Sequence, residues 1–513
     1  MKRDQFTNRY IIKISSSILI AVVNIVVQML LPRAISKEAY GYYTYDMNTF
    51  VSLVVLANLS TSNAMVAKFS KRNEEIGILR FYLKFYVLMA IVLNIGLMVT
   101  SKIPSIFASF GGQTLLVVLL ALDANIVNKL LTDTVSMYDA SAISRFPAAL
   151  QMLMKVLLSV VVVIGYAFRF LNLEVFFACM TVITGAIVLW LLVALFKDNK
   201  ERYPQQIDHG TKYYIKEYVE FCRPLVFATI FSQVVVIVMN TALMKFGGAS
   251  EQANFGVAWQ LNTMVGYVFV PYAELMKREF AVLTQDATKM RDRFHQSYKL
   301  MFWVTSYFAV FIGIFSKYLL SIVFGDLYAG ATVVTILIMY YTIYQSVGQL
   351  MGAYLIATEK TKLQAVTTVI GQILTLACVF LFQIPNFIWP ESLGSNGIAW
   401  NYLVVNMITN LILVTIIAGH LGISRVRENL IQLPAILICS GTALACFYLV
   451  GFIPGSGIVR QILQILIGGM AYTLVIGGVL YANPQFIGMS RESLQNKVQA
   501  ILAKLPRNNA KTN

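Results

Sequence analysis

Long apolar stretches, separated by short polar segments, recur along most of the chain. Each stretch has roughly 20 residues or more, which is the length that an α-helix needs to cross a bilayer. The pattern predicts membrane-spanning helices at 11–31, 42–67, 81–100, 113–138, 148–168, 175–196, 224–243, 253–276, 300–324, 331–357, 363–382, 398–418, 431–453 and 458–481. The sequence therefore predicts an all-α integral membrane protein with 14 transmembrane helices.

The longest clearly polar connection, 197–223, divides the first twelve predicted spans into two blocks of six. We therefore expect an N-terminal six-helix lobe at 1–196, a cytoplasmic linker at 197–223 and a C-terminal six-helix lobe at 224–420. Two additional transmembrane helices follow within 421–485. The tail, 486–513, has apolar residues on one helical face with basic residues nearby, which is typical of a helix lying on the inner membrane surface; an unstructured tail is the alternative.

A weak internal repeat supports two lobes of the same orientation. The segment Asp46–Val51, DMNTFV, resembles Gln260–Val265, QLNTMV, and each lies early in the second span of its six-span block. Gly41 and Gly256 precede the two segments. Because each block has an even number of spans, the two lobes share one orientation, which is the arrangement of a parallel pseudo-repeat with a substrate site between lobes.

The predicted span 113–138 carries charged residues in its interior, where a charge costs roughly 2.5–3.5 kcal/mol even on a lenient insertion scale. Polar residues recur in it at spacings of three and four, so that they share one helical face: Asn125, Asn128, Lys129, Thr132, Asp133 and Ser136. Asp123 projects away from this face. The pattern favours one wall of a polar cavity; the alternative is a polar seam between helices, closed by an i, i+4 pair of Lys129 with Asp133.

Charge is distributed as a membrane topology requires. Only 12% of the residues are charged, 58% are hydrophobic, and the net charge is +16. Lys and Arg number 22 in the loops on the N-terminal side of the predicted membrane and 7 in the loops on the opposite side. By the positive-inside rule, this asymmetry predicts cytoplasmic N- and C-termini in the cell (inner) membrane, and it accounts for the net charge without a nucleic-acid partner.

Sequence motifs for catalysis and cofactor binding are missing. The five cysteines are isolated in or beside apolar stretches, and the three histidines are far apart. No Gly-Lys dipeptide occurs, so the sequence has no GxxxxGK loop for a nucleotide phosphate. We therefore expect no catalytic residues, no metal, no cofactor and no enzyme activity.

Three short segments carry a resemblance to a known family: PRAISKEAYG at Pro32–Gly41, LIATEKTK at Leu355–Lys362 and GSNGIA at Gly394–Ala399. With these segments and its span pattern, the sequence is similar to the polysaccharide repeat-unit flippases. These are the Wzx-type O-antigen or capsule transporters of the multidrug/oligosaccharidyl-lipid/polysaccharide (MOP) exporter superfamily. The resemblance implies two six-helix lobes forming a V, two extra C-terminal helices and alternating access to a central cavity.

The resemblance also implies a substrate, an undecaprenyl diphosphate carrying an oligosaccharide. A flippase moves this polyprenyl-diphosphate oligosaccharide between leaflets of membrane lipid, from the cytoplasmic to the outer one, for O-antigen, capsule or exopolysaccharide biosynthesis. A polysaccharide polymerase and a chain-length regulator would be its functional partners. The first predicted span lacks the interior arginines of the related lipid II flippases, which argues against a peptidoglycan precursor.

Two other functions are compatible with the sequence. The first is a multidrug or small-molecule exporter of the same superfamily, because a fold does not fix its substrate. The second belongs to another class, the membrane polysaccharide polymerases and glycosyltransferases. Such enzymes need a sizeable extramembrane loop with catalytic groups, whereas the loops predicted on the outer side are short.

A lipid-linked diphosphate needs cations for its head and hydrogen-bonding groups for its sugars. Lys129 and Lys155 are the candidate cations, with pairing to Asp133 as the alternative for Lys155. Three carboxylates are candidates for coupling to H⁺ or Na⁺: Asp46, Asp123 and Asp133. The candidate sugar-binding residues are Asn24, Asn48, Asn125, Asn240, Gln260 and Asn262, with Trp259, Tyr341 and Tyr344 as stacking rings. Ordinary helix packing is the alternative for these amides and rings.

Overall fold

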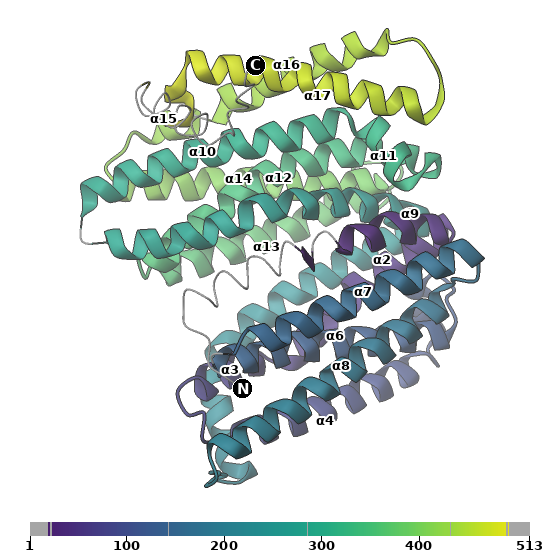
Figure 1. Ribbon diagram of the computed structural model, residues 1–513, viewed down its shortest axis with the longest axis vertical. Coiled ribbons are helices and arrows are strands. Elements are labelled where there is room, and N and C mark those ends of the chain that lie inside the picture. Colours follow the sequence, from purple (N-terminus) through teal and green to yellow (C-terminus); the bar gives the residue numbers. More distant parts are fainter. Residues whose placement is uncertain are drawn as a thin grey trace, which may run out of the picture. The chain divides into compact units, whose positions relative to one another are not determined.

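The structure is a computed structural model that describes residues 19–20, 23–141, 143–284, 286–430, 432–488 and 491. Every regular element within these residues is a helix (Figure 1). The chain is an all-α multi-pass membrane protein, as its apolar pattern predicts. The predicted amphipathic tail lies outside the described residues from residue 492 onward, and so do residues 11–18 and 21–22 of the first predicted span.

Within the described ranges, 11 helices are long and apolar enough to cross a membrane, or up to 12 if one bent pair counts as a single span. Two local features account for part of the difference from the 14 predicted spans. The described part of the first predicted span is a short apolar helix, Val23–Ala34. The predicted spans 224–243 and 253–276 together form one apolar element, Leu225–Tyr267. The count of 14 therefore stays a prediction.

The chain divides into two compact units, each of which is described separately. Unit 1 contains the described residues up to Gln260, with Val323–Val334 and Thr368–Asn401. After the short helix Val23–Ala34, its helices before residue 203 are α2 (Lys37–Asn58), α3 (Thr61–Phe69), α4 (Ile76–Thr100), α5 (Pro104–Phe107), η1 (Ala108–Phe110), α6 (Leu115–Ala140), α7 (Arg145–Phe168) and α8 (Leu173–Arg202). Helix α6 packs against α2, α3, α4 and α8, so it lies at the centre of this bundle.

The next element, α9 (Thr211–Leu283), begins in unit 1 and continues into unit 2 beyond Gln260. Gly248 interrupts α9 with a φ of 80° and a ψ of 178°, so the element is two helices joined at a kink. This backbone conformation is essentially restricted to glycine. The kink falls between the predicted spans 224–243 and 253–276, which therefore exist as separate helical segments.

Helix α2 does not continue to residue 67 as the apolar pattern predicts. Leu59 and Ser60 have φ angles of 51° and 62°, and α3 leaves α2 at a bend of 59°. The side-chain oxygen of Asn58 accepts a hydrogen bond from the Ser62 amide at 3.1 Å, and the Asn58 carbonyl accepts one from the Thr61 hydroxyl at 2.7 Å. These short polar side chains replace lost helical hydrogen bonds, which is how a broken helix is tolerated at membrane depth.

Helices α2 and α9 cross with no room for a side chain at two glycines. A Cβ atom at Gly41 would lie 1.8 Å from the carbonyl oxygen of Ala249, and one at Gly256 would lie 2.4 Å from the Thr44 hydroxyl oxygen. Beside this crossing, the Gln260 amide donates a hydrogen bond to the Tyr40 hydroxyl at 2.5 Å. Close approach of the two backbones thus depends on glycine at both positions.

Replacing Gly41 with Ala is expected to lower the free energy of unfolding by about 1–3 kcal/mol, the usual cost of overpacking. Gly96→Ala is the matched control, because a Cβ atom at Gly96 in α4 meets nothing within 4 Å. There the exchange should stabilise the helix by roughly 0.5–1 kcal/mol. Thermal melting of both variants in detergent measures the difference, and equal melting temperatures would contradict the tight crossing.

An ion-pair cluster joins the start of α9 to the turn between α3 and α4. A carboxylate oxygen of Glu217 lies 3.0 Å from Lys68 Nζ and 2.5 Å from Arg72 Nη2, and Arg72 also pairs with Glu75 at 3.2 Å. Glu217 precedes the membrane-spanning part of α9. Burial alone would raise the pKa of Glu217, but the hydrogen bonds from Lys68 and Arg72 outweigh burial and lower this pKa below its usual 4.5.

This lowered pKa makes the contribution of Glu217 to stability dependent on pH. An acid whose pKa is depressed by folding stabilises the folded state fully above its unfolded-state pKa, and the contribution is lost as the pH falls through the folded-state pKa. We expect Glu217→Gln to lower the melting temperature at neutral pH, and the difference from wild type to shrink as the pH drops below 4.5. A difference that stays constant with pH would exclude a role for the charge.

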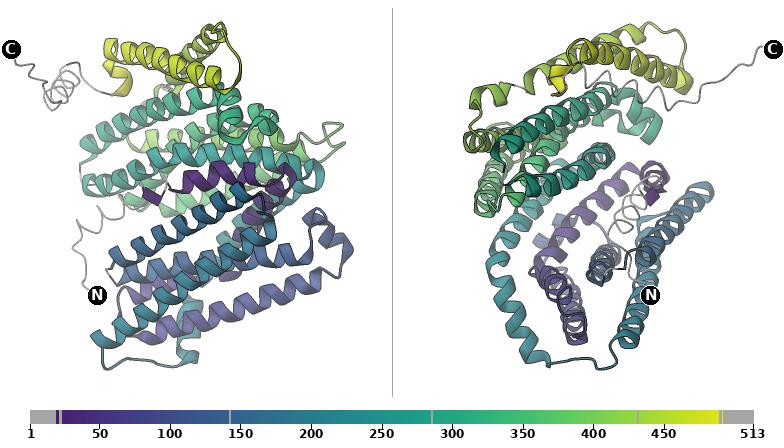
Figure 2. Two further views of the ribbon diagram at one scale, coloured as in Figure 1. Left: turned by 45° about the vertical axis from the view of Figure 1, so that its right-hand side comes forward. Right: turned by 60° about the vertical axis from the view of Figure 1, so that its left-hand side comes forward.

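Unit 2 contains Leu261–Ile322, Thr335–Thr367 and the described residues from Tyr402 onward. In it, α10 (Ala287–Ile314), α16 (Gln432–Gly451), α17 (Gly457–Ala482) and η3 (Pro484–Ile487) pack together. Helices α16 and α17 lie side by side in every view (Figures 1 and 2). The other elements after α10 in the chain are α11 (Ser316–Phe324), η2 (Asp326–Ala331), α12 (Thr332–Ala357), α13 (Thr361–Gln383), α14 (Gly394–His420) and α15 (Arg425–Leu430). Of these, η2 and most of α13 belong to unit 1.

Candidate functional site

A polar cavity of about 430 Å³ lies within unit 1, where the break between α2 and α3 meets α6 and the first half of α9. Its lining residues are Val55, Asn58, Ser60, Ser62, Asn63, Lys129, Ala228, Thr229, Ser232 and Gln233. Lys129 is the only charged residue among them, and most of the others carry a neutral hydroxyl or amide. The cavity therefore offers one cation surrounded by neutral hydrogen-bonding groups.

Lys129 is held by an anion one helical turn away. Its ammonium group pairs with Oδ1 of Asp133 and lies 3.4 Å from the hydroxyl of Ser62. The Asp133 side chain is 4% exposed, whereas the Lys129 side chain is 20% exposed. The anion of this pair is thus buried behind the cavity, and the cation is the partner that reaches its wall.

A hydrogen-bond chain fixes Asp133 in place. Its other oxygen, Oδ2, accepts a hydrogen bond from the Tyr82 hydroxyl of α4 at 2.6 Å, and Asn58 donates to the same hydroxyl at 3.2 Å. The chain Asn58–Tyr82–Asp133–Lys129 therefore links the helix break to the cavity cation. A buried ion pair is favourable only when further hydrogen bonds satisfy its remaining atoms, and Tyr82 supplies that bond here.

Removing the Tyr82 hydroxyl tests this chain. Tyr82→Phe leaves one oxygen of the buried Asp133 without its donor, which should cost about 1–3 kcal/mol of unfolding free energy. Tyr86→Phe is the matched control on the same helix, because the Tyr86 hydroxyl donates to the backbone carbonyl of Ile126 at 2.6 Å. Thermal melting of both should show the larger loss for Tyr82→Phe, and a larger loss for Tyr86→Phe would contradict the assigned chain.

The structure thus brings together two residues that the polar pattern of 113–138 singled out, Lys129 and Asp133. The ion pair of Lys129 with Asp133, which was expected if the polar face of α6 were a seam between helices, is present, and it borders a cavity. Lys155, on α7, is half-buried and makes no ion pair with any described residue. Asp133 therefore pairs with Lys129 rather than with Lys155, because the i, i+4 spacing on one helix places the closer ammonium beside it.

The two other carboxylates predicted for ion coupling lie apart from this cavity. Asp46 is fully buried in α2 and accepts a hydrogen bond from the Gln113 amide at 3.1 Å, while its second oxygen is buried without a partner among the described residues. Asp123 is half-buried and accepts a hydrogen bond from Asn94 at 3.0 Å, so it points toward α4. The direction of the Asp123 side chain agrees with the prediction that it projects away from the polar face of α6.

The predicted sugar-binding amides of unit 1 do not line the cavity. Asn125 donates to the carbonyl of Ala121 at 2.8 Å, and Asn240 donates to that of Val236 at 2.9 Å, so both bond within their own helix. Gln260 bonds to Tyr40, as described above. The half-buried side chains of Asn24 and Asn48 form no hydrogen bond to described residues. Roles in sugar binding stay predictions for all five.

The remaining predicted residues are aromatic or belong to unit 2. Trp259, in unit 1, contacts the ring of Phe255 at a centroid distance of 5.6 Å. In unit 2, Asn262 accepts a hydrogen bond from Thr342 at 2.7 Å, and Tyr344 packs on Phe302 at 6.3 Å between ring centroids. Tyr341 contacts Tyr402 in the same unit. Each contact is the helix packing expected as the alternative to a binding role.

The sequence pattern did not identify most of the residues that line the cavity. The segment Asn58–Asn63, NLSTSN, puts a nearly unbroken run of small polar residues into an apolar span, which is the signal that could have located the helix break. Thr229, Ser232 and Gln233 recur at spacings of three and four in the next block, so they share one face of α9. Tyr82 gave no signal, because a single tyrosine in an apolar helix is ordinary.

Comparison with protein-family models finds no match, and neither does comparison with curated proteins. Solved structures do share the fold. The lipid II flippase MurJ, in an inward closed conformation, is 13% identical, with a TM-score of 0.67 over 93% of this chain and 99% of that chain. An inward-facing multidrug resistance MATE family transporter of the MOP superfamily is 14% identical, with a TM-score of 0.61 over 79% of this chain and 94% of that one.

An outward-facing MATE family transporter is 12% identical, with a TM-score of 0.51 over 78% of this chain and 92% of that chain. At these identities the likeness concerns the fold. This chain therefore shares its fold with these transporters, as the two-lobe architecture implied by the sequence resemblance requires.

Proposed function

We propose that this protein is a flippase that moves a polyprenyl-diphosphate-linked oligosaccharide from the cytoplasmic to the outer leaflet of the cell membrane by alternating access. The observation that carries the proposal is Lys129, the one cation among the described lining residues of a cavity whose other described polar residues are neutral hydroxyls and amides. A diphosphate needs a cation when it leaves water, and sugars need hydrogen-bonding groups. The shared fold with a lipid II flippase supports the same class of substrate.

The size of the cavity sets what it recognises. About 430 Å³ lies in the lower half of the range for small-molecule sites, roughly 300–1,000 Å³. Such a space accommodates a diphosphate with the sugar next to it, and the distal sugars of a repeat unit would lie outside. Recognition would then depend on the part of the substrate that all repeat units share.

Asp133 acts in this proposal as an internal stand-in for the substrate phosphate. When the cavity is empty, Asp133 neutralises Lys129, which keeps a bare cation out of the membrane interior. An entering diphosphate competes for the same ammonium group. Asp133 remains held by Tyr82, so it is in place to recapture Lys129 when the substrate leaves.

A multidrug exporter is the second candidate, and the fold shared with MATE family transporters favours it. The cavity chemistry separates the two: an exporter of organic cations would place an anion at the wall, whereas here the anion is behind the cation. The polymerase or glycosyltransferase alternative loses support, because the fold shared over 93% of the chain belongs to transporters.

Asp46 is the better candidate for coupling transport to an ion, because it is fully buried with one oxygen unpartnered among the described residues. We expect Asp46→Asn to abolish the dependence of transport on an imposed H⁺ or Na⁺ gradient, and Asp123→Asn to retain it. Transport by both variants in proteoliposomes, with and without each gradient, is the measurement. Retained gradient dependence in Asp46→Asn would remove Asp46 from the coupling step.

Mass spectrometry of lipid extracts tests the proposed function in cells. A strain without the gene should accumulate a polyprenyl-diphosphate oligosaccharide, and its mass would identify the repeat unit. If the lipid does not accumulate and the surface polysaccharide is intact, small-molecule export is favoured. The same result in strains that also lack other flippases would exclude a redundant flippase as the reason. Single repeat units already exposed on the outer face would point to a polymerase.

A further inference from the structure

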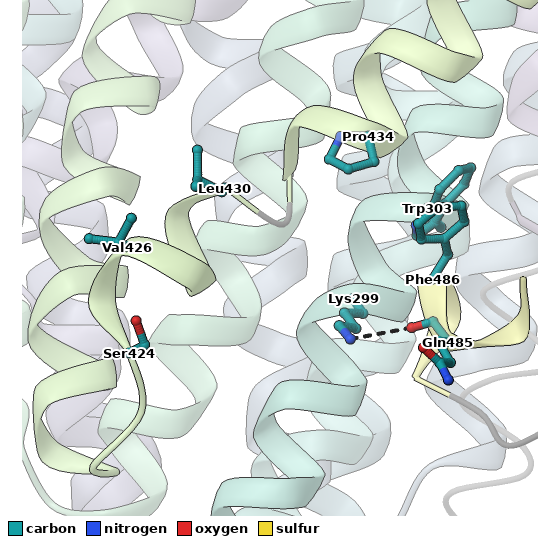
Figure 3. A pocket seen from close by; sticks show the side chains of 8 residues that line it. All are labelled: Lys299, Trp303, Ser424, Val426, Leu430, Pro434, Gln485 and Phe486. Carbon is teal, nitrogen blue, oxygen red and sulfur yellow. Dashed lines mark hydrogen bonds between the residues drawn. The ribbon is translucent and has the colours of Figure 1, made fainter.

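Unit 2 contains a second cavity, of about 520 Å³, whose lining combines basic, aromatic and aliphatic side chains (Figure 3). The lining residues are Lys299, Trp303, Ser424, Val426, Leu430, Pro434, Gln485 and Phe486. They come from α10, from α15 and the residue just before it, from α16 and from η3. Segments nearly 190 residues apart in the chain therefore form one site. For example, Lys299 Nζ donates a hydrogen bond to the backbone carbonyl of Gln485 at 3.3 Å.

The cavity lies beside the ends of α14 and α17 and beside the residues of α10 at which its predicted apolar span begins. Lys299 directly precedes the predicted span 300–324, α14 ends at His420 just before Ser424, and α17 ends at Ala482 just before η3. The loops on this side are the ones rich in Lys and Arg. The ring of Trp303 stacks on that of Phe486 at 5.4 Å, and tryptophan is enriched at the membrane–water boundary. The site is therefore at the depth of lipid headgroups.

Polarity changes across the cavity in the way that an amphiphile requires. Lys299 supplies a cation on one side, next to the stacked rings, and Figure 3 shows Val426 and Leu430 on the other side. The side chains of Val426 and Leu430 are 69% and 52% exposed, which is a large apolar rim for a water-facing surface. A ligand that fits this arrangement has an anionic head and long apolar chains.

The acidic residue of α15, which borders this site, is buried. Glu428 is the only acidic residue within α15, and it is fully buried, with a carboxylate oxygen 2.6 Å from Nδ1 of His295. Arg425, on the same short helix, is exposed. Helix α15 therefore adds no exposed negative charge beside the cavity.

We propose that this cavity binds an anionic glycerophospholipid of the surrounding membrane, with its phosphate at Lys299 and its acyl chains along Val426 and Leu430. Basic pockets between helices on the cytoplasmic side are suited to such headgroups. The chain's own tail from residue 491 is a poor occupant, because it has five basic residues and one acidic residue. A free phosphate ion would leave the apolar rim uncovered.

Native mass spectrometry of the purified full-length protein tests the proposal, with phosphatidylglycerol and phosphatidylcholine as probes. Wild type should retain phosphatidylglycerol in preference, and Lys299→Gln should lower that retention roughly fivefold. Lys289→Gln is the matched control, since it removes the same charge from the same helix at a position 74% exposed and outside this cavity. Equal losses in the two variants, or equal retention of both lipids, would overturn the proposal.

A photo-cross-linking amino acid at the exposed Val426 position identifies the occupant in native membranes. A phospholipid adduct is the expected result, and an adduct with the chain's own tail or with another protein would overturn the proposal. Displacement of phosphatidylglycerol by inorganic phosphate alone would indicate a soluble anion instead. If Lys299→Gln fails to fold, Leu430→Glu, which adds a negative charge to the exposed rim, should lower phosphatidylglycerol retention in its place.

Discussion

Replacing Lys129 with Gln is expected to lower translocation of an anionic lipid-linked substrate by roughly 10–100-fold. Hydrogen bonds to charged groups contribute about 1.5–3 kcal/mol each, and about 1.4 kcal/mol corresponds to a tenfold change. Lys129 is the only charged residue among the described residues that line its cavity, so none of these neighbours replaces the lost interaction. Lys129→Arg keeps the charge and should retain more activity than Lys129→Gln.

A fall in activity alone does not separate substrate binding from folding, because Lys129→Gln leaves the buried carboxylate of Asp133 unpaired. Breaking a buried pair from one side costs about 3–5 kcal/mol. The double variant Lys129→Gln/Asp133→Asn removes both charges, so it should regain most of the lost stability and remain inactive in transport. Recovery of transport together with stability would show that Lys129 has a structural role only.

Lys155→Gln is the most informative comparison for the same claim. It removes the same charge from α7, the next helix along the chain, but Lys155 is not among the described lining residues and makes no ion pair with any described residue. Activity close to that of wild type is expected. A loss as large as that of Lys129→Gln would mean that the diphosphate is held elsewhere or by both lysines.

Replacing Asp133 with Asn is expected to produce the opposite effect on binding. The internal anion that competes for Lys129 disappears, so the affinity for an anionic head should rise roughly tenfold, on the scale of one charge-assisted hydrogen bond. Release should slow for the same reason, and turnover should fall although binding improves. Equilibrium binding of a short-chain prenyl diphosphate and the initial rate of transport, measured on the same preparation, give both quantities.

Asp133→Glu provides the control, because it keeps the competing anion and should leave the affinity for the anionic head near that of wild type. A fall in affinity in Asp133→Asn would contradict the competition. It would indicate that Asp133 contacts the substrate itself or that its pair with Lys129 holds the cavity open.

The apolar pattern predicted the helical membrane architecture, since about 20 apolar residues in a row have few other structures available to them. It also predicted the polar face of α6, because charges inside a span stand out against their neighbours. It did not predict the break at Leu59 and Ser60, because serine and threonine are only weakly polar and barely lower the mean hydropathy of an apolar stretch. Nor did it locate Tyr82, whose role depends on a contact with a residue 51 positions away.

The glycine that precedes each segment of the internal repeat has a structural counterpart. Gly41 and Gly256 both lie where α2 crosses α9 without room for a side chain. The sequence could show that two similar segments occupy similar positions in their blocks, but not that the glycines contact the opposite helix. Side-chain contacts between distant segments depend on the register of packed helices, which a hydrophobic pattern does not encode.

Translocation in proteoliposomes tests the central claim most directly. Purified wild-type protein and Lys129→Gln are reconstituted separately with a polyprenyl-diphosphate oligosaccharide, and a membrane-impermeant enzyme measures how much substrate reaches the outer leaflet over time. We expect wild type to move the substrate, Lys129→Gln to be slower by at least tenfold and Lys155→Gln to resemble wild type. Wild type that moves organic cations but no lipid-linked saccharide would contradict the account.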